Sequence, residues 1–188
     1  MNITVFCGAS LGANCIYREK TIELGKWIAS NNHRLIYGGG KVADTVLENG
    51  GKVTGIIPTF LVEREISHPD INELITVDNM SDRKNYMVDM GDAFLALPWG
   101  PGTLEEITQV ISWARVGEND CPCIMMNVNG YYNYIEDFFN KMVNEGFLSP
   151  DDNKNTLFSE NINEIEEFII NYRKPKIRKY LSLIHIWR

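Results

Sequence analysis

Three glycine-rich segments contain the residues best suited to chemistry on a charged ligand. They read Cys7-Gly8-Ala9-Ser10, Tyr37-Gly38-Gly39-Gly40 and Leu97-Pro98-Trp99-Gly100-Pro101-Gly102-Thr103. Glycine lets main-chain N–H groups approach an anion closely, and a helix that follows adds the positive end of its dipole. A single such segment is better explained by a tight turn between a strand and a helix. Three of them together favour a phosphate site.

The spacing of these glycines limits the kind of phosphate. No glycine is followed after four residues by Gly-Lys-Ser/Thr, so the segments are not a P-loop for a triphosphate and magnesium. The dinucleotide pattern G-x-G-x-x-G is also absent from the sequence. A monophosphate is therefore the ligand that the segments favour.

Two adjacent carboxylates follow the third segment, in Thr103-Leu104-Glu105-Glu106. Thr103 is a suitable N-cap, and Glu106 three residues later would complete a capping box. Neighbouring helical residues point about 100° apart, so Glu105 and Glu106 cannot face one ligand equally. We expect one of them to be functional and the other to support it.

Arg83 is a cation in the first turn of another expected helix. Ser81 is the expected N-cap of that helix. Arg83, Met87 and Met90 share one helical face. A cation in a first turn opposes the helix dipole, so Arg83 needs an anionic partner. The spacing favours a salt bridge and a bound ligand equally.

Short apolar runs alternate with segments of helical period, which is typical of repeated βαβ units. Strands are expected at 3–6, 35–37, 53–57, 74–77, 93–97 and 123–126, and helices at 17–30, 43–48, 82–90, 103–115, 131–145 and 162–172. The continuous apolar strands indicate helices on both faces of the sheet. The sequence thus predicts an α/β three-layer sandwich with a mostly parallel sheet, whose carboxyl edge gathers the glycine segments.

Composition and charge exclude several classes of protein. The 188 residues are 44% hydrophobic, and a formal net charge of −7 gives no basic field for nucleic acid or an anionic membrane. No signal peptide or long apolar run is present in the sequence, so we expect a cytoplasmic protein. Cys7 and the Cys121/Cys123 pair are expected in strands, as buried reduced thiols in preference to a metal site. We expect one domain over 1–180 and assign no function to the tail at 181–188.

The chain resembles a known family over nearly its whole length, to about residue 172. The resemblance is carried by Asp82-Arg83-Lys84, by Ala93-Phe94-Leu95-Ala96-Leu97-Pro98 with Gly102-Thr103-Leu104-Glu105-Glu106, by the first two glycine segments, and by 50–58 and 127–132. These motifs resemble the LOG family of cytokinin-activating phosphoribohydrolases. The resemblance implies a Rossmann-like homodimer that hydrolyses nucleoside 5′-monophosphates to free base and ribose 5-phosphate, without a cofactor or metal.

The resemblance also implies roles for particular residues. Arg83 and Glu106 match the catalytic pair of the family. Positions that match its phosphate loop or line its nucleotide pocket are Gly8, Ser10, Gly39, Gly40, Met87, Gly100, Gly102, Thr103 and Glu105. Family members often carry an older label of lysine decarboxylase, but no lysine here has the context of a Schiff base to pyridoxal phosphate.

The chain departs from the family pattern at two places. Trp99 replaces the first glycine of the phosphate loop and adds bulk where the backbone should approach the ligand. About six residues that the family has between Gly40 and the next helix are absent, so either that helix is shortened or the sequence omits a loop between Val42 and Ala43. These departures keep two alternatives to the hydrolase open, namely a non-catalytic nucleotide sensor or carrier and a purely structural dimer.

Overall fold

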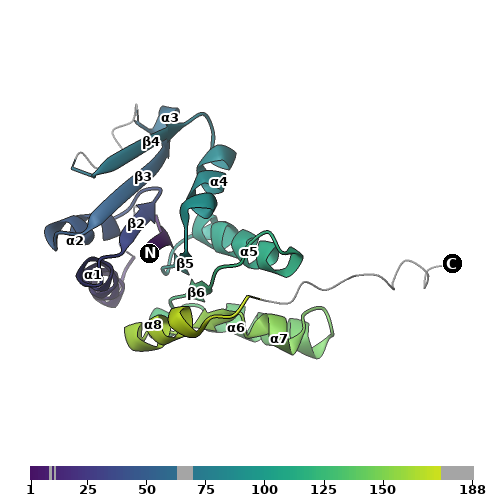
Figure 1. The fold of residues 1–188 in the computed structure, drawn as a ribbon. Helices are drawn as coiled ribbons and strands as arrows, with labels where there is room; N and C mark the ends of the chain where they lie inside the picture. Colours follow the sequence, from purple (N-terminus) through teal and green to yellow (C-terminus); the bar gives the residue numbers. More distant parts are fainter. Residues whose placement is uncertain (9, 11, 63–69, 175–188) are drawn as a thin grey trace.

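The computed structural model of the chain describes residues 1–8, 10, 12–62 and 70–174. Within them, the centre of the fold is a sheet of seven parallel strands in the order β4-β3-β2-β1-β5-β6-β7 (Figure 1). The strands are β1 (Asn2–Phe6), β2 (Arg34–Tyr37), β3 (Lys52–Pro58), β4 (Glu73–Val77), β5 (Ala93–Ala96), β6 (Cys123–Met125) and β7 (Thr156–Phe158). The predicted α/β class with its parallel sheet is confirmed.

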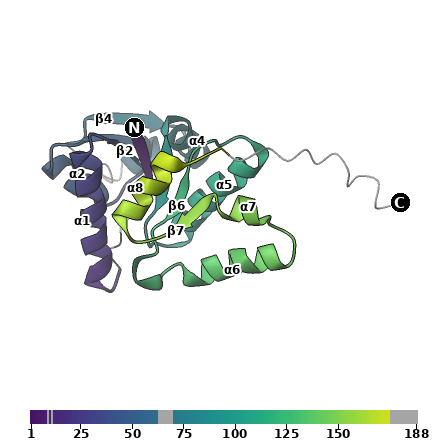
Figure 2. The same cartoon turned by 60° about the horizontal axis from the view of Figure 1, so that its bottom comes forward.

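Helices cover both faces of this sheet. They are α1 (Cys15–Ser30), α2 (Val42–Glu48), α3 (Thr59–Val62), α4 (Met80–Met90), α5 (Pro101–Val116), α6 (Asn133–Asn144), α7 (Pro150–Asn153) and α8 (Ile162–Asn171), with a 3-10 turn η1 (Val128–Gly130). Helices α1, α2 and α8 contribute to one apolar core cluster, and α4 and α5 contribute to a second (Figures 1 and 2). The three-layer sandwich is therefore confirmed. None of the helices in the described ranges is long and apolar enough to cross a membrane.

Burial on both faces explains why the central strands are continuous apolar runs. Every residue of β5 is buried, and so are all residues of β1 after Asn2. Such strands need helices on each side to shield them from water, which the two core clusters provide.

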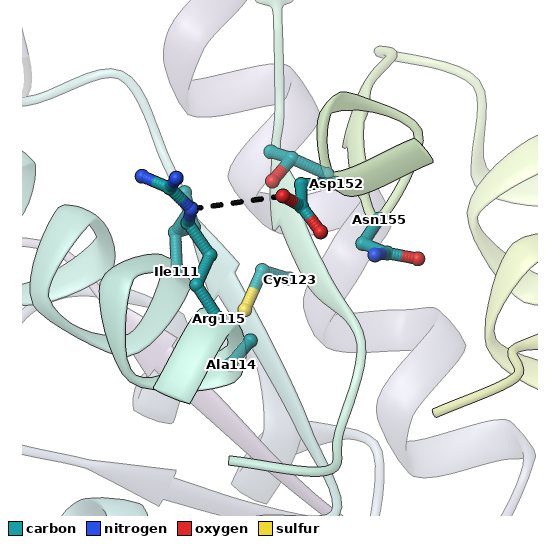
Figure 3. Close-up of a pocket in the computed structure, with 7 residues that line it drawn as sticks. Ile111, Ala114, Arg115, Cys123, Asp152 and Asn155 are labelled. Atoms are coloured by element: carbon teal, nitrogen blue, oxygen red, sulfur yellow. Dashed lines mark ion pairs between the residues drawn. The ribbon is translucent and has the colours of Figure 1, made fainter. Parts of the chain in front are cut away.

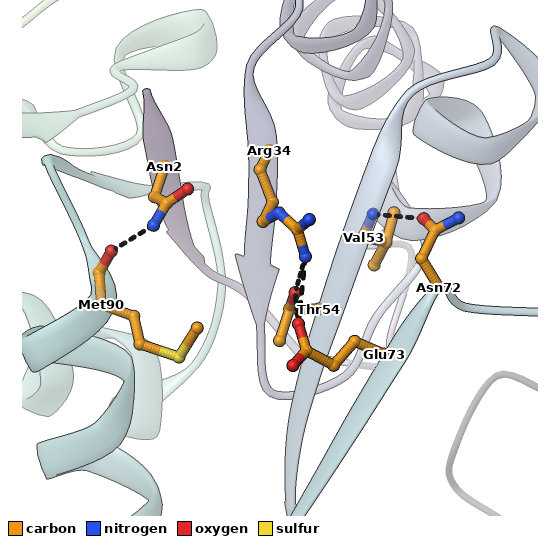
Figure 4. A network of polar contacts seen from close by, with 7 residues as sticks. All are labelled: Asn2, Arg34, Val53, Thr54, Asn72, Glu73 and Met90. Atoms are coloured by element: carbon orange, nitrogen blue, oxygen red, sulfur yellow. Dashed lines mark hydrogen bonds and ion pairs between the residues drawn. The ribbon is translucent and has the colours of Figure 1, made fainter.

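A polar network ties the strands together at their amino-terminal ends (Figure 4). Arg34 of β2 donates through Nη1 to Thr54 Oγ1 of β3 at 2.8 Å and to Glu73 Oε2 of β4 at 3.0 Å. Asn72 accepts from the Val53 N–H at 2.7 Å, and Asn2 donates to a carbonyl at the end of α4. The glycine segments lie at the other ends of the strands.

The connection after β2 is short and uninterrupted. Gly39 and Gly40 have φ of 137° and 111°, values that favour glycine, and they turn the chain directly into α2. Helix α2 starts at Val42 and continues through Ala43 for seven residues. Without that segment the chain still forms a complete crossover, with a helix of seven residues.

Two local predictions are corrected by the structure. The N-cap of α4 is Asn79, whose side chain accepts from the Asp82 N–H, so the prediction of Ser81 as the cap is wrong. Cys7 follows β1 and Cys121 precedes β6, so neither lies within a strand. Cys7 and Cys123 are buried as expected, whereas Cys121 is only half-buried. The tail at 181–188 lies outside the described residues.

Candidate active site

The three glycine segments meet at the carboxyl edge of the sheet. A methyl group added to Gly40 would lie 2.7 Å from the carbonyl oxygen of Gly8, so the segments after β2 and β1 are in contact. A methyl group added to Gly8 would lie 2.5 Å from Nε1 of Trp99, so the segments after β1 and β5 are in contact as well. The prediction that the three segments lie together at this edge of the sheet is thus confirmed.

The topology of the sheet gives this place its significance. Strand order runs from β1 through β2, β3 and β4 in one direction and from β1 through β5, β6 and β7 in the other. The order therefore reverses between β1 and β5, and ligands of open parallel sheets bind at such a switch point, outside the carboxyl ends of the strands. The segments that contain Gly8 and Gly100 flank it.

Arg83 of α4 and Glu106 of α5 form a buried ion pair beside these segments. The distance from Arg83 Nη2 to Glu106 Oε1 is 3.3 Å, and the two residues are only 8% and 7% exposed. Burial raises the pKa of Glu106, and the charge of Arg83 opposes that rise. A carboxylate with a raised pKa is a stronger base than an ordinary surface carboxylate, which suits it to accept a proton.

The guanidinium of Arg83 lies directly against the second glycine segment. A methyl group on Gly38 would come within 2.0 Å of Arg83 Nη2 and 2.3 Å of its Cζ. Nη1 lies 3.7 Å from Met80 Sδ, and Nε is buried with no hydrogen-bond partner among the described residues. The sequence spacing favoured a salt bridge and a bound ligand equally as the partner of Arg83, and the structure shows the salt bridge, to Glu106.

The predicted capping box at the start of α5 is wrong. Helix α5 begins at Pro101 with Gly100 as its N-cap, and no side chain caps it. Thr103 is therefore inside the first turn, and Glu106 is directed to Arg83 instead of to the helix end. The first turn also has no acidic side chain. Its positive end is thus not neutralised by the helix itself, which favours an external anion.

The two adjacent glutamates differ as the helical geometry predicts. Glu105 is exposed and forms an ion pair with Lys84 at 2.6 Å, whereas Glu106 is buried against Arg83. Helices α4 and α5 are thus joined by two successive cation–carboxylate pairs, and only the inner one reaches the glycine segments.

The other predicted site residues fall into two groups. In the described part of the chain, nothing beyond the adjacent residues and the helix's own backbone lies within 4 Å of a methyl group placed on Gly39, Gly100 or Gly102, so there is open space on that side of each glycine. Ser10 is exposed as well, while Thr103 is buried. Met87 is fully buried in the second core cluster, one turn after Arg83, and its place in a nucleotide pocket stays a prediction.

Sequence reasoning did not identify two tyrosines that contact the third glycine segment. Tyr131 donates its hydroxyl to the Trp99 carbonyl, and Tyr132 donates its hydroxyl to the Leu97 carbonyl, both at 2.6 Å. Their pairing within the motif Asn-Gly-Tyr-Tyr was visible in the sequence, but nothing in it revealed which backbone groups they reach.

A small cavity elsewhere does not belong to this site (Figure 3). It lies between α5, β6 and α7, is lined by Ile111, Cys123 and Asn155, and has a volume of about 10 Å³. That is room for about one water molecule. Arg115 and Asp152 face each other across it, 3.8 Å apart.

Comparison with known proteins decides the family. The family model described as "Possible lysine decarboxylase" matches residues 40–169. A cytokinin riboside 5′-monophosphate phosphoribohydrolase of Arabidopsis thaliana is 44% identical over 79% of this chain and 72% of that protein. A second Arabidopsis enzyme of that name is 40% identical over 98% of this chain and 87% of its own length. The chain belongs to the LOG family.

Solved structures of LOG-like fold are more distant. The molybdenum cofactor carrier protein of Chlamydomonas reinhardtii is 19% identical, covers 90% of this chain and 98% of its own, and has a TM-score of 0.65. The molybdenum cofactor binding protein of Rippkaea orientalis is also 19% identical, with a TM-score of 0.66 over 90% of this chain and 97% of that chain. At this identity the likeness concerns the fold alone.

Proposed function

We propose that this chain hydrolyses the N-glycosidic bond of nucleoside 5′-monophosphates, of the AMP or cytokinin type, to free base and ribose 5-phosphate. The observation that carries the proposal is the buried Arg83–Glu106 pair next to three convergent glycine segments at the switch point. The names of the relatives, which act on cytokinin riboside 5′-monophosphates, support the same reaction.

The phosphate group is assigned to the start of α5. The N–H groups of Gly100, Gly102 and Thr103 surround a helix end that no side chain caps. Pro101 at the first helical position contributes no N–H, so the remaining amides supply the hydrogen bonds. Binding a remote phosphate there fixes the sugar, and the binding energy is used to place the anomeric carbon correctly. Gly8, Ser10, Gly39, Gly40, Met87 and Glu105 are proposed to line the rest of the nucleotide pocket.

Glu106 is proposed as the catalytic carboxylate. It accepts a proton from water as the water oxygen forms a bond to the anomeric carbon. The base departs with the electron pair of the broken C–N bond and takes up a proton from solvent, to which Glu106 then releases its own. The positive charge that develops on the ribose is stabilised by the same carboxylate. Arg83 orients Glu106 through its hydrogen bond, and its charge opposes the rise in the Glu106 pKa that burial causes.

A product assay tests this function. The protein is incubated with AMP and with isopentenyladenosine monophosphate, and the free base is measured by chromatography. Glu106→Gln keeps a hydrogen-bond acceptor for Arg83 but cannot take a proton, so the rate should fall by about 10²- to 10⁴-fold. Glu105→Gln is the matched control and should lose far less, because Glu105 is exposed and pairs with Lys84. Intact nucleotides with the folded wild type, or full activity of Glu106→Gln, would refute the proposal.

The packing of Trp99 against Gly8 favours one alternative, a non-catalytic nucleotide-binding protein of the same fold. The indole takes up space between the segments after β1 and β5. The same assay distinguishes the two functions, because the alternative predicts saturable binding of AMP without release of base. Calorimetry that detects no nucleotide binding at all would exclude both.

We also propose a cytoplasmic homodimer. Phe60 of α3 and Met80 and Tyr86 of α4 are large apolar residues that are at least 41% exposed, which supports a partner on this side. The four cysteines are free thiols, in keeping with a reducing compartment. Light scattering coupled to size exclusion measures the mass, and a monomer at micromolar concentration would contradict the dimer.

A further inference from the structure

Two adjacent tyrosine hydroxyls hold the main chain at the start of the phosphate loop, which is the third glycine segment (residues 97–103). Tyr132 Oη donates to the Leu97 carbonyl and Tyr131 Oη donates to the Trp99 carbonyl, each at 2.6 Å. Both distances are short for O–H···O hydrogen bonds. Because the tyrosines are 32 and 35 residues further along the chain, they act as an external support for the loop.

The tyrosines themselves are firmly placed. The Tyr132 N–H donates to Asn127 Oδ1 at 2.7 Å, and Asn129 in the preceding turn donates its N–H to Glu160 Oε2 at 2.9 Å. The two rings are perpendicular, with centroids 5.0 Å apart, and the ring of Tyr131 makes a second edge contact with Tyr17. The position of each hydroxyl is therefore fixed by contacts that do not involve the phosphate loop.

Because the peptide group is planar, a hydrogen bond to its carbonyl also sets the direction of its N–H. In a trans peptide the C=O and the N–H of the next residue point in opposite directions, and no described peptide bond is cis. The carbonyl of Trp99 and the N–H of Gly100 belong to one peptide group. A hydroxyl that fixes the carbonyl therefore fixes the direction of the Gly100 N–H as well.

We propose that Tyr131 is a positioning residue of the phosphate loop, which directs the Gly100 N–H away from the Tyr131 hydroxyl and toward the phosphate of the substrate. The inference rests on the proposed function, since it assigns that amide to a phosphate. Tyr131 touches neither the substrate nor the reacting atoms in this role. It acts through the Trp99–Gly100 peptide alone.

Tyr132 offers a matched control within the same loop. It makes a hydrogen bond of the same length, but the peptide that it holds joins Leu97 to Pro98, and proline has no N–H. Loss of the Tyr132 hydroxyl leaves the buried Leu97 carbonyl and the Trp99 N–H without this partner and lowers stability, but the hydroxyl that fixes the Gly100 N–H stays in place. The two hydroxyls should therefore have different effects when removed.

The test compares Tyr131→Phe and Tyr132→Phe with the wild type, all as the full chain. Both variants keep the aromatic ring. Calorimetry with ribose 5-phosphate gives a Kd, AMP turnover gives KM and kcat, and adenine serves as a ligand without phosphate. We expect Tyr131→Phe to raise the Kd for ribose 5-phosphate and the KM for AMP by about 3- to 10-fold, with the Kd for adenine unchanged. Tyr132→Phe should lower the Tm while the Kd for ribose 5-phosphate stays within about twofold of the wild type.

The outcomes separate this inference from the proposed function. A Tyr131→Phe variant that binds ribose 5-phosphate as the wild type does overturns the inference alone, and so does an equal loss of affinity in Tyr132→Phe. A wild type that binds ribose 5-phosphate more tightly than Tyr131→Phe but leaves AMP intact supports the inference and refutes the hydrolase. A wild type that binds no ribose 5-phosphate overturns both.

Discussion

Replacing Gly38 by alanine should disable the site although neither Arg83 nor Glu106 is replaced. The added methyl group would lie 2.0 Å from Arg83 Nη2 and 2.3 Å from Nε and Cζ, far inside van der Waals contact. The guanidinium is the end of a flexible side chain, but it is 8% exposed and bound to Glu106, so it cannot move without weakening that bond. The substitution therefore acts on the Arg83–Glu106 pair through space.

The size of the effect follows from what the displaced pair loses. Breaking a buried ion pair by removing one partner costs about 3–5 kcal/mol. Here both partners remain and can relax, so we expect a cost of about 1–3 kcal/mol in the free energy of unfolding. For a domain of this size that lowers the Tm by roughly 3–10 °C. A catalytic group displaced by about 1 Å typically loses about 10²-fold in rate, and we expect kcat/KM for AMP to fall by that amount.

A double-mutant cycle isolates the cause. Thermal unfolding and AMP turnover are measured for Gly38→Ala, for Arg83→Ala and for the double variant. If the clash with Arg83 is responsible, Gly38→Ala should cost almost nothing in the Arg83→Ala background. Equal destabilisation in both backgrounds would mean that the backbone at residue 38 is at fault, and a fully active Gly38→Ala would refute the placement of Arg83.

Three further predictions concern the same region. Because burial raises the pKa of Glu106, kcat/KM should rise with pH through an apparent pKa above 4.5. This rise should be absent in Glu106→Gln, and a wild-type kcat/KM that stays constant from about pH 4 to about pH 8 would contradict the prediction. Trp99→Gly removes the indole that packs on Gly8, so it should lower the Kd for ribose 5-phosphate in calorimetry while lowering the Tm through lost apolar burial; a weaker Kd would show that the indole helps to bind the ligand. Asn79→Ala should cost about 1 kcal/mol in urea unfolding because it removes the cap of α4, whereas Ser81→Ala should stay within about 0.5 kcal/mol; the reverse order would contradict the observed cap.

The sequence predicts the parts of the fold that depend on patterns among neighbouring residues. Continuous apolar runs located six strands, and the glycines at their ends located the carboxyl edge, because both depend on neighbouring residues only. Strand β7 was missed although it is as long as β6, because only its first residue is buried and it lacks the continuous apolar run that located β6. The cap of α4 was misassigned for a similar reason, since Asn79 and Ser81 are both good capping residues and only the three-dimensional structure chooses between them.

The candidate site shows where local reasoning fails. Thr103 and Glu106 have the spacing of a capping box, yet α5 starts two residues earlier, at Pro101, because proline is favoured at the first helical position. Glu106 then faces α4, and its partner Arg83 is 23 residues away in the chain. That pairing depends on how two helices pack on one face of the sheet. No spacing within either helix contains this information.

The arrangement also shows how the proposed site could hold an anion next to a carboxylate in a chain of net charge −7. A sugar phosphate and an ionised Glu106 in one crevice would repel each other, and burial strengthens that repulsion because the local dielectric is low. Arg83 offsets the charge of Glu106 at 3.3 Å, so the ionised pair is close to neutral. The phosphate can then be bound by main-chain amides at the uncapped start of α5, which attract an anion without adding a net charge. In the proposed function Arg83 therefore has two roles, to orient the carboxylate and to let the carboxylate and the phosphate occupy the same site.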